Sequence, residues 1–107
     1  MTTLTSPALT LAAFDTQATA QTDTELIAAQ SGKKIAVYQV YVTSDTAITV
    51  TFETGAVTVW KQFVAAGGGS VVPFTGVPWF VTARGQALTY TTSGNAGVAV
   101  AVKAAAV

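Results

Sequence analysis

The stretch that decides the fold is AAGGGSVVPFTGVPWFVTARGQALTY, which runs from Ala65 to Tyr90. Three breaks divide it: the glycines at 67–69, Gly76-Val77-Pro78, and Arg84-Gly85. We expect glycines 67–69 to permit positive φ at a strand connection rather than to cradle a phosphate, because no Lys-Ser/Thr pair and no helix follows them. Short apolar runs separate the breaks and are predicted as strands: Val71–Phe74, Trp79–Ala83 and Ala87–Thr92.

The segment before this stretch has the clearest alternation in the chain. Within Ala47–Glu53, the apolar residues Ile48, Val50 and Phe52 alternate with polar ones, which predicts a half-buried antiparallel strand. Thr54-Gly55 closes that strand, and Val57–Val64 is predicted to return beside it as its hairpin partner.

Lys33–Thr43 is apolar on both of its predicted faces. A regular strand would place Ile35, Val37 and Tyr41 on one face. The opposite face would hold Ala36, Tyr38, Val40 and Val42. This pattern predicts either a central strand that is buried on both sides or a strand that carries a β-bulge.

The remaining segments complete an all-β chain with no convincing helix. Thr24–Gln30 is a short strand or a helical turn, and Val98–Lys103 alternates with Val98, Val100 and Val102 on one face. About eight strands at intervals of roughly 8–12 residues are typical of a sandwich or barrel. We therefore predict an antiparallel β-sandwich of jelly-roll or related topology.

The N-terminal segment differs from the rest, so we predict two parts: an extended arm at residues 1–23 and a sandwich at 24–107. The arm is rich in Thr and Ala, contains Pro7, and includes one edge strand around Ala8–Phe14. Large apolar residues are spaced along it and are predicted to bind a neighbouring subunit: Leu4, Leu9, Leu11 and Phe14. Deletion of residues 1–20 should then abolish partner binding and leave the sandwich folded.

Charge is scarce and balanced. Five Lys/Arg and five Asp/Glu give a formal net charge of zero, and only 9% of residues are charged, compared with about 25% in average domains. Without a basic stripe, nucleic-acid binding has little electrostatic support. The longest apolar run, Gly97–Val107, is too short to span a membrane and contains Lys103. A charge-poor surface favours association, which indicates that neighbours cover part of it.

Catalytic chemistry has little basis in this sequence. The chain has neither histidine nor cysteine, which removes the usual general base, the commonest zinc ligand, thiolate metal sites and disulfides. The carboxylates are scattered, and Asp23-x-Glu25 is a weak calcium candidate. We therefore expect no enzyme activity, cofactor or metal. Aromatic residues at strand spacing are either core and interface residues or a sugar-stacking platform: Tyr38, Tyr41, Trp60, Trp79 and Tyr90.

Several stretches resemble a family of small virion proteins from tailed bacteriophages. The matching pieces are KKIAVYQVYVTS, AITVTFETG, AAGGGSVVPF, WFVTARGQALT and GVAVAVK, which leave only the N-terminal arm aside. The chain departs from the family pattern at Pro78, where a glycine commonly precedes the tryptophan. Related small jelly rolls act as head decoration (cement) proteins.

The resemblance implies a structural virion protein that is made in the host cytoplasm and binds the outer surface of the phage head as a homotrimer. Its partner would be the major capsid protein, with Trp60 and Trp79 as further contact residues beside the four apolar residues of the arm. A tail, neck or baseplate component is one alternative function. A carbohydrate-binding module for host adhesion is the other.

Overall fold

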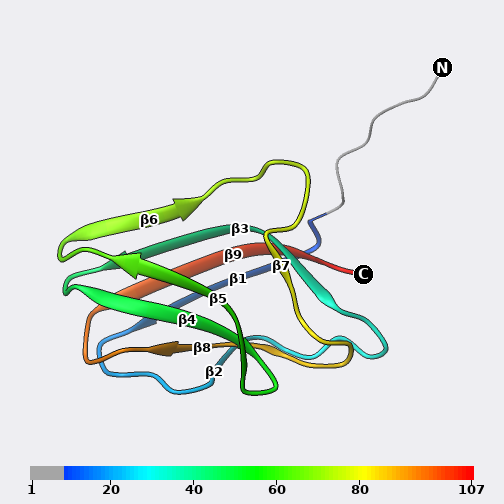
Figure 1. The fold of residues 1–107 in the computed structure, drawn as a ribbon, viewed down its shortest axis with the longest axis horizontal. Coiled ribbons are helices and arrows are strands. Elements are labelled where there is room, and N and C mark those ends of the chain that lie inside the picture. The colour runs from blue at the N-terminus through cyan, green and yellow to red at the C-terminus, as the bar shows by residue number, and fades with distance from the viewer. Residues whose placement is uncertain (1–8) are drawn as a thin grey trace.

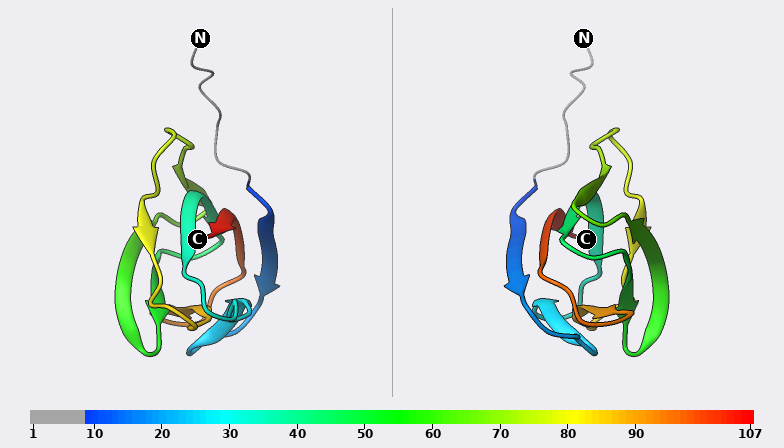
Figure 2. Two further views of the ribbon diagram at one scale, coloured as in Figure 1. Left: turned by 90° about the vertical axis from the view of Figure 1, so that its right-hand side faces the viewer. Right: turned by 90° about the vertical axis from the view of Figure 1, so that its left-hand side faces the viewer.

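The computed structural model describes residues 9–107, which form two antiparallel sheets packed face to face (Figures 1 and 2). Sheet A has the order β1-β9-β3-β6, and the short strand β7 also pairs with β3. Sheet B has the order β2-β8-β4-β5. The strands are β1 (Leu11–Gln17), β2 (Thr24–Ile27), β3 (Ile35–Ser44), β4 (Ile48–Thr54), β5 (Val57–Val64), β6 (Gly68–Val72), β7 (Phe80–Val81), β8 (Leu88–Thr92) and β9 (Val98–Ala106).

This strand order is that of a jelly roll, as the sequence predicted. The chain crosses between the sheets at most connections, and the β4–β5 hairpin and the β6–β7 connection are the exceptions. The two four-stranded paths β1-β9-β3-β6 and β2-β8-β4-β5 are the double Greek-key arrangement of jelly rolls, and β7 is an addition to the first. Residues 9–107 contain no helix, and therefore no helix long and apolar enough to cross a membrane.

Two predicted strands around the glycine-rich stretch have different bounds in the structure. Strand β6 begins at Gly68, inside the expected loop, because Gly67 alone, with φ of 67°, makes the turn and pairing with β3 starts directly after it. Strand β7 comprises only Phe80 and Val81 of the predicted Trp79–Ala83. Bonds from Trp79 N to Val37 O (2.9 Å) and from Thr82 N to Ile35 O (2.9 Å) hold its flanks beside β3.

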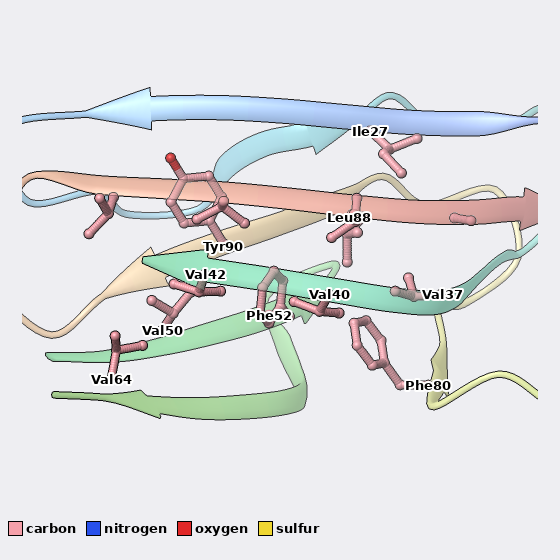
Figure 3. Close-up of a cluster of buried hydrophobic side chains, with 14 of the residues drawn as sticks. Ile27, Val37, Val40, Val42, Val50, Phe52, Val64, Phe80, Leu88 and Tyr90 are labelled. Carbon is pink, nitrogen blue, oxygen red and sulfur yellow. The ribbon is translucent and has the colours of Figure 1, made fainter. Parts of the chain in front are cut away.

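The core lies between the two sheets and is built from the predicted alternating residues (Figure 3). Strand β4 contributes Ile48, Val50 and Phe52, and β9 contributes Val98, Val100 and Val102, all of them buried. The largest fully buried side chains are Tyr90, Phe52, Ile35 and Leu88. The alternating apolar residues of β4 and β9 therefore face the space between the sheets, as the sequence predicted.

A β-bulge at Tyr38 divides β3 into two halves of opposite phase. Val37 pairs with Ala104 of β9 and Gln39 pairs with Lys103, so Tyr38 is the extra residue. Before the bulge Val37 faces the core, and after it Val40 does, while Tyr41 is turned outward. The regular-strand expectation that Tyr41 shares a face with Ile35 and Val37 is therefore wrong, and the bulge alternative is confirmed.

Each open side of the sandwich is tied by one polar contact between the sheets. On one side the Tyr90 hydroxyl of β8 donates to the Asp15 carboxylate of β1 at 2.6 Å. On the other side the Gln62 amide of β5 donates to the Ser70 hydroxyl of β6 at 3.0 Å. Both contacts are partly buried, so the bonds also satisfy polar atoms that would be costly to leave unpaired there.

Part of the predicted N-terminal arm belongs to sheet A. Strand β1 is the edge strand expected there, shifted to Leu11–Gln17, and it pairs with β9 at all seven positions. A deletion of residues 1–20 would remove this strand from sheet A, so we now expect it to destabilise the sandwich as well as to affect partner binding. Leu4 lies outside the described residues.

The two-residue turn between β4 and β5 offers a test of backbone strain. Gly55 (φ 54°) and Ala56 (φ 67°) are both left-handed, as in a type I′ turn, but alanine pays a steric penalty there. We expect Ala56→Gly to raise the free energy of unfolding by about 0.5–1 kcal/mol, measured by urea denaturation. The control Ala99→Gly, within β9, should lower it by a similar amount; a loss of stability in both variants would contradict the turn assignment.

The Tyr90–Asp15 contact predicts a pH-dependent contribution to stability. Two hydrogen bonds lower the pKa of the Asp15 carboxyl: the larger effect comes from the Tyr90 hydroxyl and the smaller one from the Gln17 side chain. The contact therefore contributes fully above the unfolded pKa of about 3.9 and is lost as pH falls through the lowered folded pKa. Tyr90→Phe should lower the free energy of unfolding by about 1.5–3 kcal/mol at pH 7, and this difference should narrow below pH 4.

Urea titrations of both proteins at pH 7 and pH 3 measure the difference, with Tyr41→Phe as the matched control for an exposed tyrosine. A Tyr90→Phe effect that is the same at both pH values would show that the Asp15 carboxylate does not contribute.

Candidate functional site

The outer face of sheet A is the most distinctive surface of the molecule. The register aligns Phe14 of β1, Ala101 of β9, Tyr41 of β3 and Val71 of β6 in one row across the sheet. Phe14 is 69% exposed, Val71 52% and Tyr41 47%. Single exposed apolar residues need no explanation, whereas a contiguous row of them is a candidate interaction site.

A hollow lies in the middle of this row, over Ala101. Its volume is about 360 Å³, and its lining includes Phe14, Tyr41, Gln39 and Lys103 besides small or aliphatic residues of β1 and β9. Because β9 lies between β1 and β3, the two aromatic residues are separated by two strand spacings, about 9–10 Å. Carbon contacts need about 3.5–4.0 Å on each side, so this aromatic slot accepts one flat or aliphatic group.

Lys103 is the single charged residue in the rows of the outer face. It pairs with Ala12 on one side and with Gln39 on the other, and the neighbouring rows carry Thr16, Ala99 and Thr43. No carboxylate therefore lies beside it in these rows. The face combines an apolar floor, two aromatic walls and one ammonium group, which suits an apolar side chain with an acidic neighbour.

The outer face of sheet B is polar over β4 and β8, whereas its edge strand β5 places the exposed Phe63 opposite Thr49. Thr51 and Glu53 of β4 lie beside Thr91 and Thr89 of β8. The Thr91 hydroxyl donates to the Glu53 carboxylate at 2.7 Å. Burial is the main cause that raises the pKa of Glu53, and the neighbouring Asp23 raises it further, against the effect of Thr91. Within residues 9–107 no group of three or more potential metal-ligating side chains is present.

The predicted contact residues of the arm are divided between the inside and the outside of the sandwich. Leu11 packs against the main core, and Leu9 packs on a second small cluster formed by Ala36, Tyr38 and Ala105. Of the three predicted contact residues of the arm that the structure describes, only Phe14 is largely exposed. The structure brings it together with Tyr41 and Lys103, which the sequence did not single out as partners.

Trp60 and Trp79 pack against each other and do not form a flat platform. Their ring centroids are 6.1 Å apart with planes inclined by 54°, and Trp60 also stacks on Phe80 at 5.6 Å. Trp79 donates from Nε1 to the Pro73 carbonyl at 2.8 Å. The pair belongs to the β5–β7 side of the molecule, whereas Phe14 lies on β1, so it does not join the aromatic slot.

No family model, curated protein or solved structure matches this chain.

The sequence left Trp79 as a core or interface residue or as part of a sugar-stacking platform, and in the structure it is 39% exposed. Its replacement should therefore cost less than the 3–5 kcal/mol typical of a buried aromatic. We expect Trp79→Ala to lower the free energy of unfolding by about 1–2 kcal/mol, through loss of the Trp60 contact and one hydrogen bond. Phe52→Ala, at a fully buried position, should cost about 3–5 kcal/mol in the same urea titration. Equal losses in the two variants would mean that Trp79 is a core residue.

Proposed function

We propose that this protein is a structural bacteriophage virion protein, a capsid decoration (cement) protein that lays the outer face of sheet A on the major capsid protein. The observation that carries the proposal is the exposed row of Phe14, Ala101, Tyr41 and Val71 on a chain with little charge. The identity of the partner comes from the resemblance to phage virion proteins.

The size of the face supports a role in which many copies act together. Four strands and the three rows from Ala12 to Thr16 cover roughly 300–400 Å² when strand spacing and rise are taken into account. A standard stable interface buries about 800 Å² on each partner. One copy would thus bind weakly through this face, and repetition over a capsid lattice would supply the avidity.

The chemistry of the face supports a protein partner more than a sugar. The slot is lined mainly by alanine, valine and aromatic side chains, and its polar groups, Gln39 and Lys103, lie at one end. An apolar side chain from a capsid loop would fill the space, and an acidic neighbour would meet Lys103. A tail, neck or baseplate partner would use the same face in the same way.

Sugar binding is the second candidate, and the aromatic slot is the feature that favours it. Phe14 and Tyr41 could hold a sugar ring between them with Gln39 and Lys103 as hydrogen-bond donors. Glycan-array binding that Tyr41→Ala abolishes would favour this function over capsid binding.

The proposal predicts that filling the slot abolishes capsid binding. Ala101→Trp places a large ring on the outer face, between Phe14 and Tyr41, where it should occupy the hollow without disturbing the core. We expect this variant to remain folded by circular dichroism and to lose at least tenfold in binding to phage heads assembled without the protein, measured by co-sedimentation.

The matched control is Thr49→Trp, which adds the same ring to the outer face of sheet B and should leave binding unchanged. Undiminished binding by Ala101→Trp would refute the use of this face, and equal loss in both variants would refute its specificity.

A further inference from the structure

Strand β1 is an edge strand whose second side has no partner among residues 9–107. It pairs with β9 from Leu11 to Gln17, and its backbone bonds to no other described segment. Figure 2 shows it (dark blue) at the outer margin of sheet A. An edge of seven residues presents a row of N–H and C=O groups that another strand can pair with.

The other edges of the sandwich carry features that discourage pairing. Strand β5 has the exposed Lys61 and an irregularity in its register with β4. Strand β2 has only four residues, carries Glu25 and is also irregular. Strand β6 begins with two glycines and is followed at once by Pro73. Charges, bulges, shortness and proline are the means by which proteins protect sheet edges.

Strand β1 has fewer of these protective features than the other edges. Its register with β9 is regular, and it contains neither lysine nor proline. Its one charged residue, Asp15, points inward to the Tyr90 hydroxyl. At its centre is Phe14, the most exposed aromatic residue of sheet A. A regular edge of this length, whose one carboxylate is already hydrogen-bonded to Tyr90, is suited to strand addition.

We propose that β1 pairs antiparallel with β1 of a second copy of this chain, about a two-fold axis at Phe14. This inference does not rest on the proposed function. The strand is self-complementary in that register: Phe14 lies opposite its own copy, Ala12 opposite Thr16, and Ala13 opposite Asp15. No two carboxylates face each other, and the chain has no net charge to oppose association.

The pairing would join two outer faces into one surface. The row Tyr41, Ala101 and Phe14 of one copy would continue directly into the row of the second copy. The order there would be reversed: Phe14, Ala101 and Tyr41. The two phenylalanines would cover each other as a cross-strand pair. The contact is two-fold and therefore differs from the three-fold association that the resemblance implies.

Disulfide trapping in this cysteine-free chain tests both the contact and its register. Residues directly opposite in an antiparallel pair have Cα atoms about 4.5–5.5 Å apart, within disulfide reach. Phe14→Cys should therefore form a covalent dimer under mild oxidation. Ala12→Cys alone should not form one, because position 12 of the second copy would lie four residues further along the strand, about 13 Å away. A mixture of Ala12→Cys and Thr16→Cys should form the mixed dimer.

Phe63→Cys, at an exposed position of sheet B, is the control for random collision. Crosslinking of Phe63→Cys or of Ala12→Cys alone to the same extent as Phe14→Cys would overturn the proposal.

A charge pair tests the contact without cysteine and without loss of Phe14. In the proposed register, Ala12→Lys with Thr16→Lys places like charges opposite each other, and Ala12→Lys with Thr16→Glu places opposite charges there. Sedimentation velocity should show a dimer for the wild-type protein. The dimer dissociation constant should rise at least tenfold in the first variant and stay within threefold of wild type in the second. A wild-type monomer at every concentration, a trimer, or equal weakening by both variants would overturn the proposal.

Discussion

The β-bulge at Tyr38 is the constraint on which the remaining structure depends. It lets β3 turn Ile35 and Val37 into the core at one end and Val40 and Val42 at the other. Without the extra residue, the second half would turn Tyr41 inward and two valines outward. The bulge thus gives the central strand of sheet A a continuous buried side, and it also places Tyr41 in the exposed row opposite Ala101.

The two sheets differ in their outer surfaces. Threonine hydroxyls and Glu53 line β4 and β8 of sheet B, with Phe63 of β5 exposed beside them, whereas alanine, aromatic and valine side chains form a continuous row across sheet A. Small residues on β9 are what make the aromatic slot, because Ala101 fills none of the space between Phe14 and Tyr41. The inner faces form the core, so a partner must bind an outer face or an edge, and the apolar row of sheet A crosses four paired strands.

Much of the fold followed from the pattern of residues, and much of the site did not. Regular alternation located β4 and β9 because each has one exposed and one buried face, although β9 runs on to Ala106 beyond the predicted Lys103. The position of β5 followed from the turn signal at Thr54-Gly55. The aromatic slot was not predicted because Lys33–Thr43 is apolar on both of its faces. A β-bulge reverses the inward and outward positions that follow it, and the sequence pattern does not show where the bulge lies. The partial exposure of Trp79 was not predicted either. Its place beside Pro78 suits a core residue as well as a surface one, and in the structure it packs on Trp60 near the surface. Which residues meet across β1, β9 and β3 depends on register, which is a property of the assembled sheet.

The most direct test of this account is the cross-strand contact of Tyr41, measured by nuclear Overhauser effects in the isotope-labelled protein. The account predicts that the backbone of Tyr41 lies opposite Ala101 and that of Gln39 opposite Lys103. A regular strand continued from the Val37–Ala104 pair would instead set Tyr41 opposite Val100. Contacts of Tyr41 with Ala101 would establish the outward row, and contacts with Val100 would contradict the bulge and the exposed face that depends on it.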